Sequence, residues 1–344
     1  MQFPNFPQGC RSLLCKYLTA EVFDHLKAKR TCSGFTLEQA IRSGVENPDS
    51  SIGVYAGDEE SYSVFKELFD PIIEDYHGFS KEAQHQSQMD PAALRSAVLD
   101  PEGEYILSTR IRVGRNIDAM PLEPALSKEQ RLQVEADAVL ALNALEGELE
   151  GEYYPIQGMP EEVQKSLIED HFLFKEGDRF LESAGINRDW PEGRGIYHNH
   201  DKTFLVWVNE EDQMRIISMQ QGGDVYAVFS RLVNAVGQIS RTLDFAYSEH
   251  LGYIASCPTN LGTAMRASVH IALPLLGKEK ERFKAITEQY HLQIRGVHGE
   301  HSESEGGVYD VSNKRRLGIT EVQAVQDLID GVAALIEEEK SLGV

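Results

Sequence analysis

The residue types most suited to chemistry lie in one stretch, Cys257 to His270, which reads CPTNLGTAMRASVH. It follows an apolar segment, Gly252–Ser256, which is predicted to be a strand. After a turn of small and polar residues the chain alternates, so that Arg266, Ser268 and His270 share one face of a second predicted strand. A cysteine at a strand end beside a cation can hold a thiolate that faces a ligand. The alternative is an amphipathic surface strand with a buried structural cysteine.

Five arginines form the second candidate group. Arg110 and Arg112 are two residues apart on a predicted strand, 105–113, so their side chains share a face with Ser108. Two neighbouring like charges repel each other, and an anion bound between them removes that objection. The other three lie on predicted strands or just before a glycine-rich loop: Arg215, Arg266 and Arg295. For any one arginine taken alone, a solvated surface ion pair is the commoner role.

Two glutamates lie in acidic turns. Glu211 is in Asn209–Asp212, between predicted strands Phe204–Val208 and Arg215–Met219, and Glu300 is in a loop with four glycines. A solvated hairpin turn accounts for the first and a mobile acidic loop for the second. The residue types alone therefore leave both glutamates open between a surface role and a chemical one.

Bulk composition limits the classes of partner. The 344 residues include 33 Lys and Arg against 55 Asp and Glu, a net charge of −22. Such an acidic surface argues against nucleic acid or an anionic membrane as the main partner. No apolar run reaches membrane-spanning length and no secretory signal is evident, so a cytoplasmic protein is expected. The four cysteines have no metal-ligand spacing, which favours reduced thiols and argues against zinc.

The pattern of the chain predicts an α+β protein. Residues 11–77 show helical periodicity, whereas short strands alternate with helices from Glu104 onward. We expect a small all-helical N-terminal domain at 1–83, a polar linker at 84–97 and a larger domain at 98–344. The larger domain should hold a mainly antiparallel sheet flanked by helices. Capping-box spacing marks three helix starts, at Thr36, Ser127 and Thr320, and Gly44 suits a helix exit.

Several separated blocks resemble the phosphagen (guanidino) kinases. They are the stretch from Cys257 to His270, STRIR at 108–112, FLVWVNEEDQMRIISMQQGGD at 204–224 and RGVHGEH at 295–301. The blocks occur in the family order, and the resemblance runs from about Gly44 to Glu337. It implies the two-domain α+β fold described above. It also implies reversible transfer of the γ-phosphoryl group of MgATP to a guanidine, with L-arginine as the expected substrate.

The resemblance also implies a role for each candidate residue. The residues expected to bind ATP or ADP are Ser108, Arg110, Arg112, His171, Arg215, Arg266, His270 and Arg295. Those expected to bind the guanidine are Ser50, Ser51, Ile52, Tyr55, Glu211, Cys257 and Glu300. The residues expected to act in catalysis are Glu211, Cys257, Glu300 and Arg215. Mg²⁺ is expected on phosphate oxygens and water rather than on protein side chains.

The choice of substrate stays open in places. The loop Ser50–Gly53 reads SSIG where arginine-specific members of the family have SGVG, so Ser51 replaces a glycine. Tyr76 is the residue type expected for arginine rather than creatine, and Asp49 and Arg179 match a pair that links the two domains. The alternatives are taurocyamine or creatine as substrate, a kinase of protein arginines, or an inactive nucleotide-binding protein. Monomer and homodimer are both compatible with the sequence.

Overall fold

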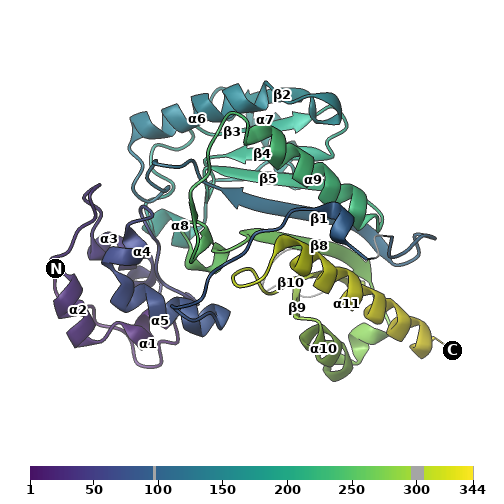
Figure 1. Ribbon diagram of the computed structural model, residues 1–344, viewed down its shortest axis with the longest axis horizontal. Coiled ribbons are helices and arrows are strands. Elements are labelled where there is room, and N and C mark those ends of the chain that lie inside the picture. Colours follow the sequence, from purple (N-terminus) through teal and green to yellow (C-terminus); the bar gives the residue numbers. More distant parts are fainter. Residues whose placement is uncertain (96–97, 296–305, 344) are drawn as a thin grey trace.

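The computed structural model describes residues 1–95, 98–295 and 306–343, and it begins with a compact group of short helices (Figure 1). These are α1 Leu13–Tyr17, α2 Ala20–Leu26, α3 Leu37–Glu46, α4 Ser61–Val64 and α5 Lys66–His77. The predicted capping box is present at the start of α3, where Thr36 accepts from the backbone of Gln39 and Gln39 accepts from that of Thr36. The segment between α3 and α4 holds Ser50–Tyr55, which therefore lies within the helical part.

Over the described residues, an eight-stranded antiparallel sheet forms the larger part of the molecule. Its spatial order is β2-β3-β4-β5-β1-β8-β10-β9. The strands are β1 Ile106–Arg115, β2 Gly151–Pro155, β3 Gly195–Asn199, β4 Phe204–Val208, β5 Met214–Gln221, β8 Met265–Ala272, β9 Leu292–Arg295 and β10 Val308–Asn313. A separate pair, β6 Tyr247–Ser248 and β7 Gly252–Tyr253, makes a two-stranded ribbon. The predicted α+β class and antiparallel sheet are confirmed.

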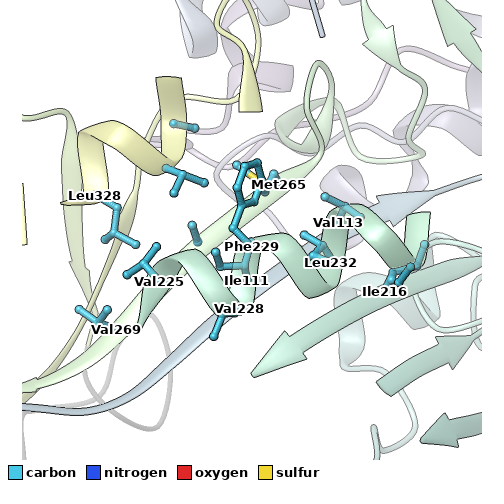
Figure 2. Packing of buried hydrophobic residues seen from close by; sticks show 14 of the residues in the cluster. Ile111, Val113, Ile216, Val225, Val228, Phe229, Leu232, Met265, Val269 and Leu328 are labelled. Atoms are coloured by element: carbon cyan, nitrogen blue, oxygen red, sulfur yellow. The ribbon is translucent and has the colours of Figure 1, made fainter. Parts of the chain in front are cut away.

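Two long helices cover one face of this sheet. They are α9 Val225–Ile239, which packs on β1 and β5, and α11 Glu321–Leu342, which packs on β8 and β10 (Figure 1). Apolar side chains from both layers, among them Ile111, Phe229 and Leu328, interlock in the core (Figure 2). Because strand side chains alternate, this burial leaves the polar half of β1 and β8 on the opposite face.

The larger part has further helices, the first of which adds Ala138 and Leu142 to the same core. They are α6 Lys128–Leu142, α7 Glu161–Glu169, α8 Arg179–Ser183 and α10 Lys280–Gln289. Short 3₁₀ turns lie at Pro91–Ala93, Gly147–Leu149, Pro258–Asn260 and Leu276–Lys278. The predicted capping boxes at Ser127 and Thr320 open α6 and α11.

The helical part and the larger part share a hydrophobic core. Phe69 of α5 and Ile52 belong to the same buried cluster as Ile254, Cys257 and Leu261. The predicted linker also packs on the larger part, since the His85 N–H donates to Glu249 O at 2.9 Å and the Gln88 N–H donates to Glu321 Oε2 at 2.8 Å.

Three local predictions are wrong. Gly44 lies inside α3 instead of ending it, and glycine is needed there for close packing, because a Cβ would stand 2.3 Å from the Gly53 carbonyl oxygen. The strand predicted at 252–256 stops at Tyr253, because the carbonyl groups of the following residues are used by the helical part. Cys10 and Cys15 form a disulfide, whereas reduced thiols were expected. Their Cα atoms lie 6.3 Å apart, within bridging range, because the chain turns just before α1.

Candidate active site

A cavity of about 620 Å³ lies on the polar face of the sheet. Six of the eight residues predicted to bind nucleotide line it: Ser108, Arg110, His171, Arg266, His270 and Arg295. The other two, Arg112 and Arg215, line a small neighbouring recess that shares Arg266 with the cavity. The structure therefore brings all eight residues to one face of the sheet, and most of them come from the three central strands.

The arginines are closer together than folding alone would favour. Arg112 on β1 lies directly opposite Arg266 on β8, an arrangement in which like charges destabilise a sheet. Burial and the neighbouring Arg215 and Arg266 lower the pKa of Arg110 to about 10. Burial and the same neighbours lower the pKa of Arg112 well below its ordinary value. An anion with several oxygens would relieve this repulsion.

Arg110 also has guanidinium nitrogens that make no hydrogen bond in the described part of the chain. Within the described part of the chain, its Nε and one Nη are buried without a hydrogen-bond partner. Its guanidinium lies 5.5 Å from the ring centroid of Trp207, and that of Arg215 lies 5.6 Å from the same ring. The indole thus gives both cations an apolar wall, and the unpaired N–H groups of Arg110 are left for a ligand.

Asp310 on β10 is a cavity residue that the sequence analysis missed. Arg266 donates to its carboxylate at 2.8 Å, and His270 Nε2 lies 3.6 Å from its other oxygen. Burial would raise the pKa of Asp310, but His270 and Arg266 outweigh it and lower that pKa. Asp310 therefore fixes the side chains of two predicted nucleotide ligands. A strand pattern gives no signal for it, because its position depends on the register of β10 beside β8.

Glu211 stands at the end of the arginine group. Its Oε2 accepts from Arg215 at 3.0 Å and its Oε1 accepts from Asn260 at 3.2 Å. Burial raises the pKa of Glu211 to about 7, against the opposing charge of Arg215. The Arg215 guanidinium also pairs with Glu210 at 2.7 Å. These two carboxylates outweigh burial, so the pKa of Arg215 is raised.

Cys257 lies against Glu211 and a hydroxyl. Its Sγ is 3.1 Å from Thr259 Oγ1. Burial, followed by the charge of Glu211, raises the pKa of Cys257 to about 12. Without a bound cation this residue is therefore a neutral thiol. Tyr55 lies near both groups. Burial raises the pKa of its hydroxyl, and the charges of Cys257 and Glu211 raise it further.

The helical part contacts the Cys257 turn at three points. The Tyr62 hydroxyl donates to the Ala255 carbonyl at 2.6 Å, and the Ala56 N–H donates to the Ser256 carbonyl at 2.8 Å. His77 Nε2 lies 2.8 Å from the Pro258 carbonyl, and burial lowers the pKa of this histidine to about 4. These contacts place the segment Ser50–Tyr55 beside Cys257 and Glu211. This segment holds the residues Ser50, Ser51, Ile52 and Tyr55 that are predicted to bind the guanidine, and it is called the guanidine loop below.

The guanidine loop itself is only partly exposed. Ile52 and Tyr55 are buried in the shared core, whereas Ser51 is exposed and Ser50 is half-buried. The backbone N–H groups of Leu13 and Leu14 donate to the carbonyls of Ser51 and Ile52, both at 3.0 Å. The loop is therefore fixed by its carbonyls and by two side chains, which leaves other backbone groups for a ligand.

Asp49 and Arg179 form the predicted link across the two parts. The guanidinium binds both carboxylate oxygens, with one N–H···O contact at 3.0 Å. Arg179 also donates to the side-chain oxygen of Asn47 at 3.2 Å. The pair is more than half exposed, so its contribution to stability is small. Its geometry instead fixes the guanidine loop relative to α8.

Arg316 is a second residue that the sequence analysis missed. It lies in the recess with Arg112 and Arg215, and it donates to the side-chain oxygen of Asn260. Burial, together with nearby arginines, lowers its pKa. Its place in the basic run Lys314–Arg316 was the only available signal, and charge runs usually mark a solvated surface.

Some predicted residues fall elsewhere. Glu300 and most of the glycine-rich loop, 296–307, lie outside the described residues. Tyr76 is 47% exposed on α5, and its proposed part in choosing a substrate stays a prediction. The described ranges contain no group of three or more His, Cys, Asp or Glu side chains able to hold a metal ion. In the same ranges, no helix is long and apolar enough to cross a membrane.

Comparison with known proteins decides the family. The model of the ATP:guanido phosphotransferase N-terminal domain matches residues 8–74, and that of the C-terminal catalytic domain matches residues 133–342. The chain belongs to the ATP:guanido phosphotransferase family. The resemblance drawn from the Cys257 stretch is therefore confirmed.

Three relatives show how far the similarity extends. An arginine kinase of Anthopleura japonica is 57% identical over 334 residues, which are 96% of this chain and 47% of that protein. An arginine kinase of Penaeus vannamei is 55% identical over 97% of this chain and 94% of its own length. The crystal structure of a lombricine kinase superposes with a TM-score of 0.94 at 40% identity, over 99% of this chain and 95% of the other. The chain thus spans about half of the first relative and nearly all of the other two.

Proposed function

We propose that this phosphotransferase is an arginine kinase, which transfers the γ-phosphoryl group of MgATP to L-arginine and reverses the reaction. The observation that carries the proposal is the row of closely spaced arginines that ends at Glu211 and Cys257. The row suits a triphosphate, and the acidic end suits a guanidinium. The identity of 57% and 55% to two arginine kinases supports arginine as the guanidine.

One group of residues is proposed to bind the nucleotide and another to bind the guanidine. Arg110, Arg112, Arg215, Arg266 and Arg295 would hold the phosphates, and Ser108, His171 and His270 the rest of the nucleotide. The donors that Arg110 keeps free in the described chain fit phosphate oxygens. Mg²⁺ would arrive on the nucleotide and neutralise phosphate charge there. Since phosphoryl transfer has a loose transition state, the main work of these residues is alignment.

The carboxylates would hold the guanidinium and take its proton. In the proposed step a guanidino nitrogen forms a bond to the γ-phosphorus while the bond from that phosphorus to the β,γ-bridging oxygen breaks. ADP leaves with the bond electrons, and the nitrogen loses one proton. Glu211, with its pKa raised to about 7, is suited to accept it. Glu300 is proposed as the second carboxylate, and Cys257 as a charge that the bound guanidinium stabilises.

Ser50, Ser51, Ile52 and Tyr55 are proposed as the loop that recognises the amino-acid end of the substrate. Residue 51 does not have the left-handed backbone that would require glycine, whereas Gly53 has φ +80°. Serine is therefore accommodated at position 51 without backbone strain. We further propose domain boundaries at 1–83, 84–97 and 98–344, a cytoplasmic location where ATP is available, and a monomer or homodimer.

A coupled assay tests the proposal directly. Purified protein with MgATP is offered L-arginine, taurocyamine, creatine and lombricine, and ADP release is followed for each. We expect kcat/KM to be highest for arginine. A higher value for another guanidine would replace arginine as the substrate, and ADP release that does not depend on any guanidine would overturn the kinase assignment.

A further inference from the structure

A buried amide, Asn116, joins the two turns that carry the proposed catalytic groups. It follows directly on β1 and is 2% exposed. Its Oδ1 accepts from the Gln213 N–H at 2.9 Å. Its Nδ2 donates to Asp212 Oδ1 at 3.0 Å and to the Ile254 carbonyl at 2.9 Å. Asp212 is adjacent to Glu211, and Ile254 lies three residues before Cys257.

The surroundings leave these groups little freedom. The second carboxylate oxygen of Asp212 packs on β1, where a Cβ at Gly114 would stand 2.6 Å from it. Gln213 is also fixed, since its Oε1 accepts from the Ile117 N–H and its Nε2 donates to the Pro121 carbonyl, both at 2.8 Å. The acidic turn is thus held from its C-terminal side by two interlocking amides.

Only an amide can make this set of contacts. The position requires one acceptor and two donors at once, which aspartate or serine cannot supply. Without the amide, a buried N–H, a buried carbonyl and a buried carboxylate oxygen would each lose a partner. A further bond, from Ser256 Oγ to the Glu211 carbonyl at 3.3 Å, joins the same two turns but is longer.

We propose that Asn116 is a positioning residue for phosphoryl transfer. It sets the separation between the Glu211 turn and the Cys257 turn, so that both side chains face one guanidinium. This inference rests on the proposed function. Misplacement of reacting groups by about 1 Å can cost about 100-fold in rate, so a residue without substrate contact can control kcat.

The principal test is Asn116→Ala, with Asp100→Ala as its control. Asp100 is also buried and accepts from three backbone N–H groups, but it lies at the opposite end of β1 and contacts neither turn. We expect Asn116→Ala to lower kcat at least about tenfold while the KM for MgATP changes less than about twofold. The control should lower the thermal midpoint as well but leave kcat within about twofold.

A substrate-free measurement separates this inference from the proposed function. In a Cys32→Ser background, the rate of Cys257 alkylation by iodoacetamide reports its distance from the Glu211 charge. We expect Asn116→Ala to raise this rate, because the carboxylate moves away, and the control to leave it unchanged. This result is expected even if the wild type phosphorylated no guanidine. An unchanged alkylation rate, or equal losses of kcat in both variants, would overturn the positioning role.

A reciprocal exchange gives a second test where alanine prevents folding. Asn116→Asp keeps the size of the side chain but removes both donors, and Asp212→Asn supplies a donor from the other side. We expect each single variant to lose activity and the double variant to exceed both in kcat, because one hydrogen bond and the local charge are restored. A double variant whose kcat does not exceed that of the more active single variant would contradict the proposal.

Discussion

Replacing Glu211 by glutamine tests the proposed mechanism at its most specific point. The change keeps the size of the side chain and removes the charge that would face the guanidinium. Loss of one preorganised electrostatic partner costs about 2.7–4 kcal/mol at a transition state, which is about 10²- to 10³-fold in kcat. Glu211 has only two side-chain partners that the structure defines, Arg215 and Asn260, so the loss should appear in rate more than in folding.

The neighbouring carboxylate provides a matched control. Glu210 also pairs with Arg215, at 2.7 Å, but Asn260 binds only Glu211 of the two. Glu210→Gln therefore removes the same charge from the same arginine without removing the proposed base. We expect it to lose less than about tenfold in kcat, with its main effect on the KM for MgATP through Arg215.

Steady-state kinetics across pH gives the decisive measurement. With the pKa of Glu211 raised to about 7 in the free enzyme, the wild-type kcat/KM for arginine should fall as the pH drops below that value, because the base becomes protonated. Glu211→Gln should lack this limb in kcat/KM. The mechanism would be refuted if this variant kept kcat within about threefold of wild type, or if its profile retained the same limb.

Three further predictions concern the cysteines and the guanidine loop. Cys257→Ala should lose most activity yet fold, and MgADP with arginine should protect Cys257 from alkylation; wild-type turnover of the alanine variant would remove its electrostatic role. Ser51→Gly should leave arginine the preferred guanidine in a kcat/KM comparison, and a switch to creatine would contradict the assignment of the loop. Thiol titration of the denatured, unreduced protein should give two thiols, Cys32 and Cys257, and four after reduction of the bond between Cys10 and Cys15.

Strand periodicity made the arginine-bearing face of the sheet predictable. Once Arg110 and Arg112 were placed on one strand, a two-residue repeat fixed their common face, and β1 has them there. The helix starts were also predictable, because a capping box is a local interaction between neighbours in sequence. Apolar alternation in β8 likewise identified which half of the strand enters the core.

Contacts between distant segments could not be read from the same patterns. Asp310 reaches Arg266 only because β10 pairs with β8 in one register. Asn116 gains its role from two turns that lie 96 and 138 residues away in the chain. The bond between Cys10 and Cys15 depends on a turn before α1 that no spacing rule encodes. Tertiary geometry decides each of these, and local propensity contributes little.

Proton release on guanidine binding gives a final test of the charge state of the site. At pH 7 Glu211, with a pKa of about 7, is about half protonated, so a bound guanidinium that lowers this pKa should release about 0.5 proton. Cys257 starts as a thiol, with a pKa of about 12, and its conversion to a thiolate would release about one more. Calorimetric titrations with arginine in buffers of different ionisation enthalpy measure the total. Release of about 1.5 protons supports the thiolate, release near 0.5 leaves Glu211 as the only group that ionises, and no release contradicts direct contact between the guanidinium and either group.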